Sequence, residues 1–263
     1  MKLASASLLT LAMSTAAVLP ALAKDPTADP SSEVPSNQDI AAVSPALAEY
    51  HEDLLLDEVW GREGLSARDR SVATLAAVIA RNHRVEIRIQ VERALDNGVE
   101  PAVISETITQ LAFYTGWGNA MSAVTVVQDV FADRGIGADQ LPDADPELLP
   151  LDMEAEEARE ASVEATYGGS SDGVLHYTTD VLFRDLWLRP ALSPRDRSLV
   201  TVSALIAAGK TEQVGFHLNR AMDNGLTRGE ASELLTQLAF YAGWPNVFST
   251  LPVAKEIFES RAE

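Results

Sequence analysis

One ten-residue stretch occurs twice in this chain. Residues 110–119 read Gln-Leu-Ala-Phe-Tyr-Thr-Gly-Trp-Gly-Asn and residues 237–246 read Gln-Leu-Ala-Phe-Tyr-Ala-Gly-Trp-Pro-Asn, so eight of ten positions are identical at a spacing of 127 residues. Self-similarity at a fixed spacing indicates a duplicated structural unit. The sequence therefore predicts two copies of one fold, and the functional question is what each copy surrounds.

The match between the copies extends well beyond this stretch. Residues 65–71 read Leu-Ser-Ala-Arg-Asp-Arg-Ser and residues 192–198 read Leu-Ser-Pro-Arg-Asp-Arg-Ser, which are identical at six of seven positions. Further upstream, Tyr50 and Trp60 match Tyr177 and Trp187. We place the first repeat at residues 46–134 and the second at residues 173–263, joined by an acidic linker over residues 135–172.

The Leu-Ser-x-Arg-Asp-Arg segments have the pattern of helix starts. Ser66 and Ser193 are typical N-cap residues, and the Asp three positions later in each copy predicts a capping box. Pro194 suits the first helical position. The helices that follow, over residues 72–80 and 199–208, are apolar nearly all round, so we expect both at the centre of the core.

Other capping signals divide each repeat into further helices. The third helices are expected to end at Gly98 and Gly225, which fit a left-handed C-cap. The fourth helices begin at Pro101, which suits the first helical position, and at Thr227, where Thr-Arg-Gly-Glu forms another capping box.

The repeated stretch itself is expected to interrupt the helical part of each unit. The fourth helices should break at Gly116 and Gly243, and the last should cover about residues 118–133 and 245–261. No run of period-two alternation predicts a strand. The expected fold class is all-α: two tandem five-helix units joined by the acidic linker.

Charge and cysteine content exclude several function classes. The net charge of −19 argues against nucleic-acid binding and against docking on anionic lipid, since both need a basic surface. The chain has no cysteine, which removes disulfides, thiolate nucleophiles and redox dithiols.

The first 23 residues have the features of an export signal. Lys2 supplies the positive charge, an apolar segment follows, and Ala21-Leu22-Ala23 is a small-x-small cleavage site. We expect cleavage after Ala23 and a periplasmic or secreted protein with no stable membrane insertion. The alternative is an uncleaved membrane anchor, for which the apolar segment is short.

Two further segments have low apolar content. Residues 24–45 are rich in Pro, Ser and Asp and are predicted to be a flexible leader. The linker at 135–172 carries a dense run of carboxylates, interpreted as a solvated connector in preference to a cation site; a helix is expected around its Glu-Ala-Glu-Glu-Ala-Arg-Glu part.

Taken together, these motifs resemble the carboxymuconolactone decarboxylase-like family, within the wider alkylhydroperoxidase D-like superfamily. The resemblance rests on the Leu-Ser-x-Arg-Asp-Arg starts, on His-Leu-Asn-Arg-Ala-Met-Asp-Asn-Gly-Leu-Thr-Arg-Gly-Glu at 217–230, and on the repeated stretch. It implies helical units that form homo-oligomers, and for a tandem chain a trimer is favoured.

The resemblance also separates two chemistries. The peroxidase branch uses a Cys-x-x-Cys pair, which this chain lacks, so it is not a Cys-based peroxidase. The decarboxylase branch works without a metal or organic cofactor, so acid–base side chains are the expected apparatus and a small organic acid or lactone the expected substrate.

His217 is the first catalytic candidate, because it occupies the position of the family's motif histidine. A decarboxylation needs a proton delivered to carbon, and a histidine titrates in the required range. The alternative is a capped or solvent-facing histidine. The first repeat has Gln90 at the matching position, so the chemistry is expected in the second repeat.

Two glutamates and an arginine are further candidates for this site. Glu212 or Glu233 is predicted to orient His217 or to act as a second acid–base group. Arg197 is a candidate for holding a substrate carboxylate, with a structural salt bridge as its alternative.

Tyr241, Trp244 and Asn246 surround the Gly243 break and are candidate substrate-binding residues. Packing of the core or of an interface is the alternative for the aromatic pair. The four histidines show no metal-ligand spacing, so no metal site is predicted.

Two function classes follow from these candidates. The first is a cofactor-independent lyase or isomerase for a small carboxylated lactone or organic acid. The second is a non-catalytic oligomeric binding or scaffold protein. A peroxide-related role with an external thiol partner is a weaker third possibility.

Overall fold

A computed structural model describes residues 34–261, and every regular element among them is helical, with no strand. The first repeat contains α2 (Pro45–Glu49), the π-helix η1 (Tyr50–Val59), α3 (Ala67–Ala80), α4 (Arg84–Asp96), α5 (Pro101–Thr115) and α6 (Trp117–Asp133). The second contains α8 (Asp172–Tyr177), η3 (Thr178–Phe183), η4 (Leu186–Leu188), α9 (Pro194–Ala207), α10 (Thr211–Asp223), α11 (Arg228–Ala242) and α12 (Trp244–Ser260). The all-α prediction is confirmed.

The predicted helix boundaries are mostly confirmed by cap geometry. The Ser66 and Ser193 hydroxyls accept hydrogen bonds from the backbone N–H groups of Asp69 and Asp196. Thr227 and Glu230 form the complete capping box expected at the start of α11. Gly98 (φ 78°) ends the third helix of its repeat in the left-handed region that glycine adopts without strain.

The capping boxes predicted at Ser66 and Ser193 are wrong in their second half. The Asp69 and Asp196 carboxylates do not return to the N-cap backbone but bind arginines of the opposite repeat. Arg68 Nη2 donates to Asp196 at 2.8 Å, and Arg195 Nη2 donates to Asp69 at 2.9 Å. An arginine is a stronger partner for a buried carboxylate than a backbone amide that water can reach.

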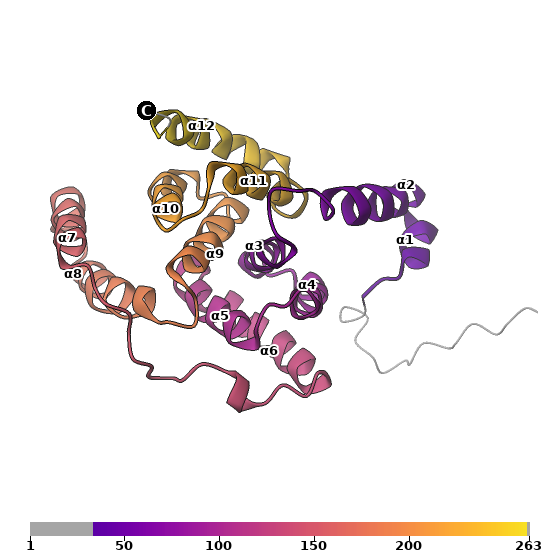
Figure 1. Cartoon of the computed structure of the whole chain (residues 1–263), viewed down its shortest axis with the longest axis horizontal. Helices are drawn as coiled ribbons and strands as arrows, with labels where there is room; N and C mark the ends of the chain where they lie inside the picture. The colour runs from indigo at the N-terminus through magenta and orange to yellow at the C-terminus, as the bar shows by residue number, and fades with distance from the viewer. Residues whose placement is uncertain (1–33, 262–263) are drawn as a thin grey trace, which may run out of the picture.

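The core is built around α3 and α9, which lie side by side in the middle of the molecule (Figure 1). Both are apolar nearly all round, as predicted: Val78 and Leu199, for example, are fully buried. Burial of a side chain of this size stabilises a fold by about 1.5–3 kcal/mol.

The two repeats are interleaved across this central pair. Helix α5 of the first repeat packs on α9 of the second, and α11 of the second packs on α3 of the first. Each half of the core is therefore completed by the other repeat, a relationship that the sequence alone does not indicate.

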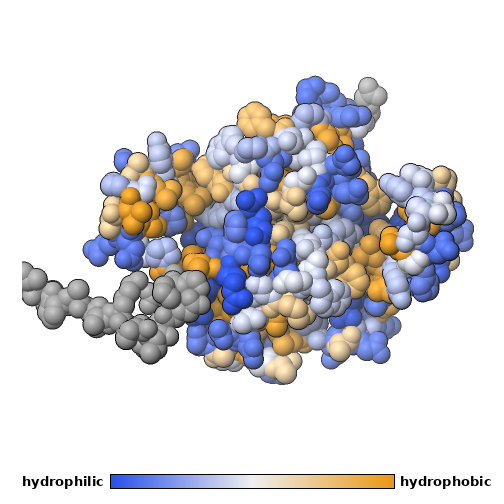
Figure 2. Space-filling view, turned by 180° about the vertical axis from the view of Figure 1, so that it is seen from behind, coloured by the Kyte–Doolittle hydropathy of each residue, from blue (hydrophilic) through white to orange (hydrophobic). Residues whose placement is uncertain are grey.

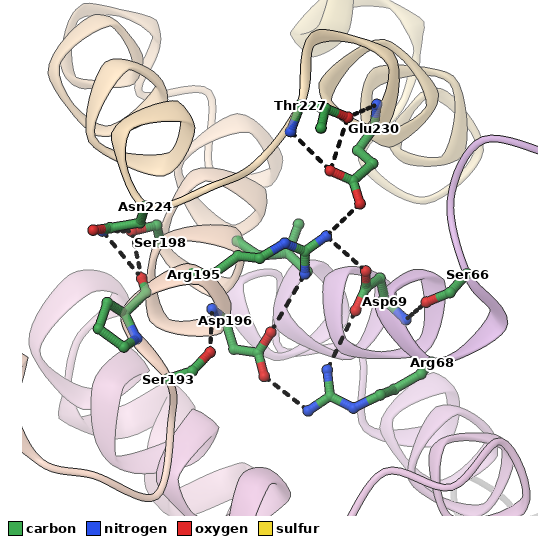
Figure 3. A network of polar contacts seen from close by, with 12 residues as sticks. Ser66, Arg68, Asp69, Ser193, Arg195, Asp196, Ser198, Asn224, Thr227 and Glu230 are labelled. Carbon is green, nitrogen blue, oxygen red and sulfur yellow. Dashed lines mark hydrogen bonds and ion pairs between the residues drawn. The ribbon is translucent and has the colours of Figure 1, made fainter.

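A polar network joins the amino-terminal ends of α3 and α9 (Figure 3). Arg195 binds Asp69 and also Glu230 at 2.7 Å, while Arg68 binds Asp69 at 3.2 Å and Asp196. Near this network, the amide of Asn224 donates to the Ser198 hydroxyl at 3.0 Å. The bonds from Arg68 to Asp196 and from Arg195 to Asp69 join the two repeats at their shared centre.

Outside the repeats, parts of the predicted flexible leader and of the predicted linker are helical. Residues 37–43 of the predicted leader form α1 (Asn37–Val43), which begins with a capping box between Ser36 and Asp39. The predicted linker helix is confirmed as α7 (Met153–Tyr167), after a short 3-10 turn, η2 (Ala138–Gln140). The predicted export signal and leader residues 24–33 lie outside the described residues.

The two ends of the molecule carry different elements. Figure 1 places α7 and α8 at one end and α1 and α2 at the other. Figure 2 shows hydrophobic side chains on the lobe at the left of the view, and the exposed apolar side chains of the α1–α2 end include Val43, Leu47 and Tyr50. None of the helices within residues 34–261 is long and apolar enough to cross a membrane.

Candidate functional site

A pocket of about 460 Å³ lies beside Trp187 in the second repeat. We call it the Trp187 pocket. Its walls come from the linker, from η3 and η4, and from α10. The residues that line it are Leu149, Pro150, Leu151, Asp152, Ala155, Glu156, Arg159, Phe183, Trp187, Leu188, Pro194, Phe216, Asn219, Arg220, Asp223 and Asn224.

Arg220 is the unpaired cation of this pocket. Its guanidinium lies 4.3 Å from the Trp187 ring and 5.4 Å from the Phe183 ring. Among the described residues it makes no ion pair, and its buried Nε has no hydrogen-bond partner. Burial lowers the pKa of the guanidinium, which still remains charged near neutrality. A half-buried arginine without a carboxylate partner is a natural binding group for an anionic ligand.

His217 lies one turn before Arg220 on α10, behind the pocket wall. Its ring stacks on Trp187 at 5.8 Å and meets Tyr114 edge-on at 5.2 Å. The side chain is 6% exposed, and Nδ1 has no hydrogen-bond partner among the described residues. Burial, with a smaller contribution from Arg220, lowers its pKa to about 4. His217 is therefore neutral at pH 7.

Tyr114 reaches this cluster from the first repeat. Its phenol oxygen accepts a 2.9 Å hydrogen bond from Trp187 Nε1. Burial raises the pKa of the phenol well above its ordinary value, so the tyrosine keeps its proton. The cluster beside the pocket thus combines His217, Trp187 and Arg220 of one repeat with Tyr114 of the other.

The predicted grouping of His217 with Glu233 and Arg197 does not occur. Arg197 is fully buried and binds Glu106 and Gln110 of α5, at 3.1 and 2.8 Å. Glu233 instead binds Arg62 at 2.7 Å and Arg70 at 3.3 Å. The reason is the interleaved packing, which places each glutamate of α5 and α11 against the arginine of the opposite repeat.

The other predicted site residues also lie elsewhere. Tyr241 accepts a hydrogen bond from Trp60 at 2.9 Å, and this bond is the first-repeat equivalent of the bond from Trp187 to Tyr114. Glu212 is exposed at the start of α10. The Asn246 amide donates to the carbonyl oxygens of Ala207 and Ala242, a structural role. Trp244 is 51% exposed and lines a separate apolar groove between α11 and α12.

The first repeat keeps part of the His217 cluster. Arg93 lies 4.4 Å from the Trp60 ring, as Arg220 does over Trp187. Gln90 replaces His217 and donates to Glu86 at 2.7 Å. The arginine–tryptophan pair is therefore common to both repeats, whereas the histidine is specific to the second.

Sequence reasoning missed three residues of the pocket, Arg220, Arg159 and Phe183. A signal existed for Arg220, because Arg93 occupies the matching position and both follow the Gln90 or His217 position by one helical turn. No such signal marked Arg159, which belongs to the linker. Within residues 34–261, no group of three or more His, Cys, Asp or Glu side chains is placed to hold a metal ion.

Comparison with known proteins agrees with the duplicated architecture. Two segments, residues 45–129 and 172–256, match the carboxymuconolactone decarboxylase family, and together they make up more than half of the chain. Part of the chain is similar to 4-carboxymuconolactone decarboxylase of Acinetobacter baylyi, at 36% identity over 75 residues, covering 28% of this chain and 56% of that protein.

Two other relatives match over comparable lengths. Nitrosuccinic acid decarboxylase npaB of Metarhizium robertsii is 32% identical over 78 residues, covering 30% of this chain and 54% of that protein. An uncharacterized 15.0 kDa protein of Paracoccus denitrificans is 29% identical over 84 residues, covering 31% and 63%. The chain thus spans little more than half the length of the relatives it matches. With both repeats matched by the family pattern, the chain belongs to the carboxymuconolactone decarboxylase family.

Proposed function

We propose that this protein is a lyase that removes CO2 from a small organic acid bound in the Trp187 pocket. The observation that carries the proposal is Arg220, an unpaired guanidinium held against two aromatic rings at the pocket wall. The decarboxylase names of two relatives support this reaction type. The residues beside the pocket are consistent with an acid–base reaction.

The reaction requires a place for negative charge. When the bond between carbon and the carboxylate breaks, its electron pair passes into an acceptor group, either a conjugated carbonyl to give an enolate or a nitro group to give a nitronate, and a proton is then added to the carbon. A guanidinium in a pocket of low polarity stabilises that developing charge far more than it would in water. We assign this role to Arg220.

His217 is proposed to take part in the proton transfer. With a pKa near 4 it is mostly unprotonated in the empty protein, so it cannot act as a strong acid there. An anionic substrate placed nearby favours the protonated form and raises the pKa of the imidazole toward the working range. His217 is not itself part of the pocket lining, so this role requires Trp187 or Phe216 to shift when substrate binds.

A non-catalytic binding function is the second candidate. The low pKa of His217 favours it, because a histidine that stays neutral provides little general-acid catalysis. The same pocket and the same arginine would then only hold the ligand.

One experiment separates these functions. The purified protein is incubated with 4-carboxymuconolactone and with nitrosuccinate, and CO2 release is measured together with the thermal shift. For a lyase we expect turnover that falls by roughly a hundredfold in Arg220→Gln and His217→Gln, since each loses a charge-stabilising or proton-transferring group. Arg93→Gln, the matched variant of the first repeat, should keep full turnover.

Each result has a clear reading. Ligand stabilisation without CO2 release would establish binding alone. Turnover that is unchanged in Arg220→Gln would refute the assignment of the pocket.

We also propose that the protein acts after export, with cleavage after Ala23. The support is the sequence of residues 1–23. Amino-terminal sequencing of the protein recovered outside the cytoplasm should begin at Lys24, and an intact Met1 would refute this proposal.

A further inference from the structure

The Trp187 pocket has one wall that belongs to neither repeat. Residues 149–152, Ala155, Glu156 and Arg159 line it, and they lie between the two segments, 45–129 and 172–256, that match the family. We propose that this part of the linker is a specificity element, in which Arg159 contacts a second anionic group of the ligand while Arg220 contacts the first. The inference rests on the proposed site but not on turnover.

The wall is attached to the second repeat by specific bonds. The backbone N–H of Leu149 donates to the carbonyl of Leu188 at 2.8 Å. Arg159 Nη2 donates to the Thr179 hydroxyl at 3.2 Å, and Arg184 Nη2 donates to Glu160 at 2.6 Å. The segment is therefore not a solvated connector at this point, and α7 is held over η3 with a defined face toward the pocket.

Arg159 is a buried arginine with one unpaired donor atom. Its side chain is only 7% exposed, and its Nε and Nη2 bind the Glu156 carboxylate at 2.8 and 2.7 Å. Its Nη1 is buried with no hydrogen-bond partner among the described residues. A buried donor left unpaired is costly, and an acceptor on a bound ligand removes that cost.

The two pocket arginines flank the same aromatic ring. Arg159 lies 4.2 Å and Arg220 5.4 Å from the Phe183 ring. Burial is the main cause of the lowered pKa of Arg220, and the positive charge of Arg159 lowers this pKa further. Glu156 forms its bidentate pair with Arg159 and leaves Arg220 without a bonded carboxylate. A ligand with two carboxylates, one toward each arginine, offsets this repulsion, whereas a monocarboxylate satisfies only one of them.

The test compares succinate with butyrate, which have the same number of carbons and differ by one carboxylate. Binding to the full-length protein is measured by calorimetry. We expect succinate to bind roughly tenfold more tightly than butyrate. Arg159→Gln should abolish this preference and leave butyrate binding within about twofold of its original value. Arg159→Lys, which keeps the charge but not the fork, should retain part of the preference.

A second variant distinguishes a ligand contact from a structural role. Glu156→Gln removes the carboxylate that neutralises Arg159, so succinate binding should become about threefold tighter. Arg134→Gln is the control, because Arg134 pairs with Asp96 on the surface of the first repeat at 2.8 Å and does not line the pocket. It should leave both affinities unchanged.

Two outcomes overturn the proposal. One is a wild-type protein that does not prefer succinate. The other is that Arg159→Gln and Glu156→Gln each weaken the binding of both succinate and butyrate, while circular dichroism shows that both variants are folded. That result would mean that the Arg159–Glu156 pair only supports the wall. Neither outcome depends on CO2 release, so this proposal and the proposed reaction can fail separately.

Discussion

The phenol of Tyr114, in the first repeat, accepts a hydrogen bond from the indole of Trp187, in the second repeat. The equivalent hydrogen bond, from Trp60 to Tyr241, has the same length. Trp187 Nε1 lies 2.9 Å from Tyr114 Oη, and Trp60 Nε1 lies 2.9 Å from Tyr241 Oη. Each tyrosine belongs to the ten-residue stretch that occurs twice. The stretch thus completes the tryptophan cluster of the other repeat, not that of its own.

The first prediction concerns the two glutamates that bind arginines of the opposite repeat. Glu106 is 1% exposed at its side chain and binds the fully buried Arg197 and also Arg189, which is 14% exposed. Glu233 is 15% exposed and binds the equally buried Arg70 and also Arg62, which is 42% exposed. Glu106→Gln leaves a buried arginine without its charge partner and should lower the free energy of unfolding by about 3 kcal/mol. Glu233→Gln, whose site water can reach, should cost about 1 kcal/mol. Urea denaturation measures both, and equal losses would contradict the difference in burial.

The sequence predicts the helices more fully than the site. Caps at Ser66, Ser193 and Thr227 are local signals, because a cap bonds to its own backbone within three residues. The burial of α3 and α9 follows from their apolar segments, residues 72–80 and 199–208, which have apolar side chains on nearly all sides. In contrast, the pairing of α5 with α9 depends on tertiary packing, and the spacing between the two repeats in the sequence does not show how they pack.

The candidate site shows the same division. His217 was assigned from its motif, and its proximity to the pocket depends on Trp187, whose match with Trp60 is visible in the sequence. Its expected partners, Glu233 and Arg197, belong to the same repeat, whereas the cluster contains Tyr114 of the other repeat. Arg159 was not predictable, since a linker rich in carboxylates gives no sign that one of its arginines is buried.

The second prediction is a pH dependence of stability caused by His217. Its pKa is about 4 in the folded protein, against 6.5 for the ordinary side chain, so the unfolded chain binds more protons between these values. Stability must therefore fall as the pH falls through this window, with the full effect reached below about pH 4. At about pH 5 the loss due to His217 should be about 2 kcal/mol.

The measurement compares the wild-type protein with His217→Gln, which installs the residue found at the matching position 90. Urea denaturation at about pH 7.5 and about pH 5 gives two differences in the free energy of unfolding. The many carboxylates affect both proteins equally and cancel in the comparison. If the two proteins lose the same stability on acidification, the histidine is not buried as a neutral group.

The third prediction concerns the arginines at the centre of Figure 3. Arg195 binds Asp69 and Glu230 and is 24% exposed, while Arg68 is 35% exposed and binds Asp69 and Asp196. Because these charges form a network, Arg195→Ala should cost about 1–2 kcal/mol, more than the median for an isolated surface pair. The wild-type protein should also lose part of this stabilisation at about 1 M salt, and Arg195→Ala should be less sensitive. Equal salt sensitivity in both proteins would show that the network adds no net stability.

The last prediction concerns self-association. Equivalent faces of the two repeats expose apolar side chains at three matching positions, which are Trp117, Met121 and Val124 on α6 and Trp244, Phe248 and Leu251 on α12. Phe113 on α5 is exposed beside the first of these faces. Exposed apolar patches rimmed by polar residues mark interaction surfaces, and two such patches on one chain allow a closed ring of copies. We therefore propose a homo-oligomer, with a trimer favoured, assembled through these faces.

Light scattering coupled to size-exclusion chromatography tests this proposal. Trp117→Glu and Trp244→Glu, each placing a charge within one patch, should shift the protein toward the monomer, because a buried unpaired carboxylate opposes association. Val43→Glu is the matched control, since Val43 is 88% exposed but lies on α1, away from both patches. A wild-type protein that runs as a monomer at all concentrations would refute the assembly, whereas dissociation by Val43→Glu alone would move the interface to the α1–α2 end of the molecule.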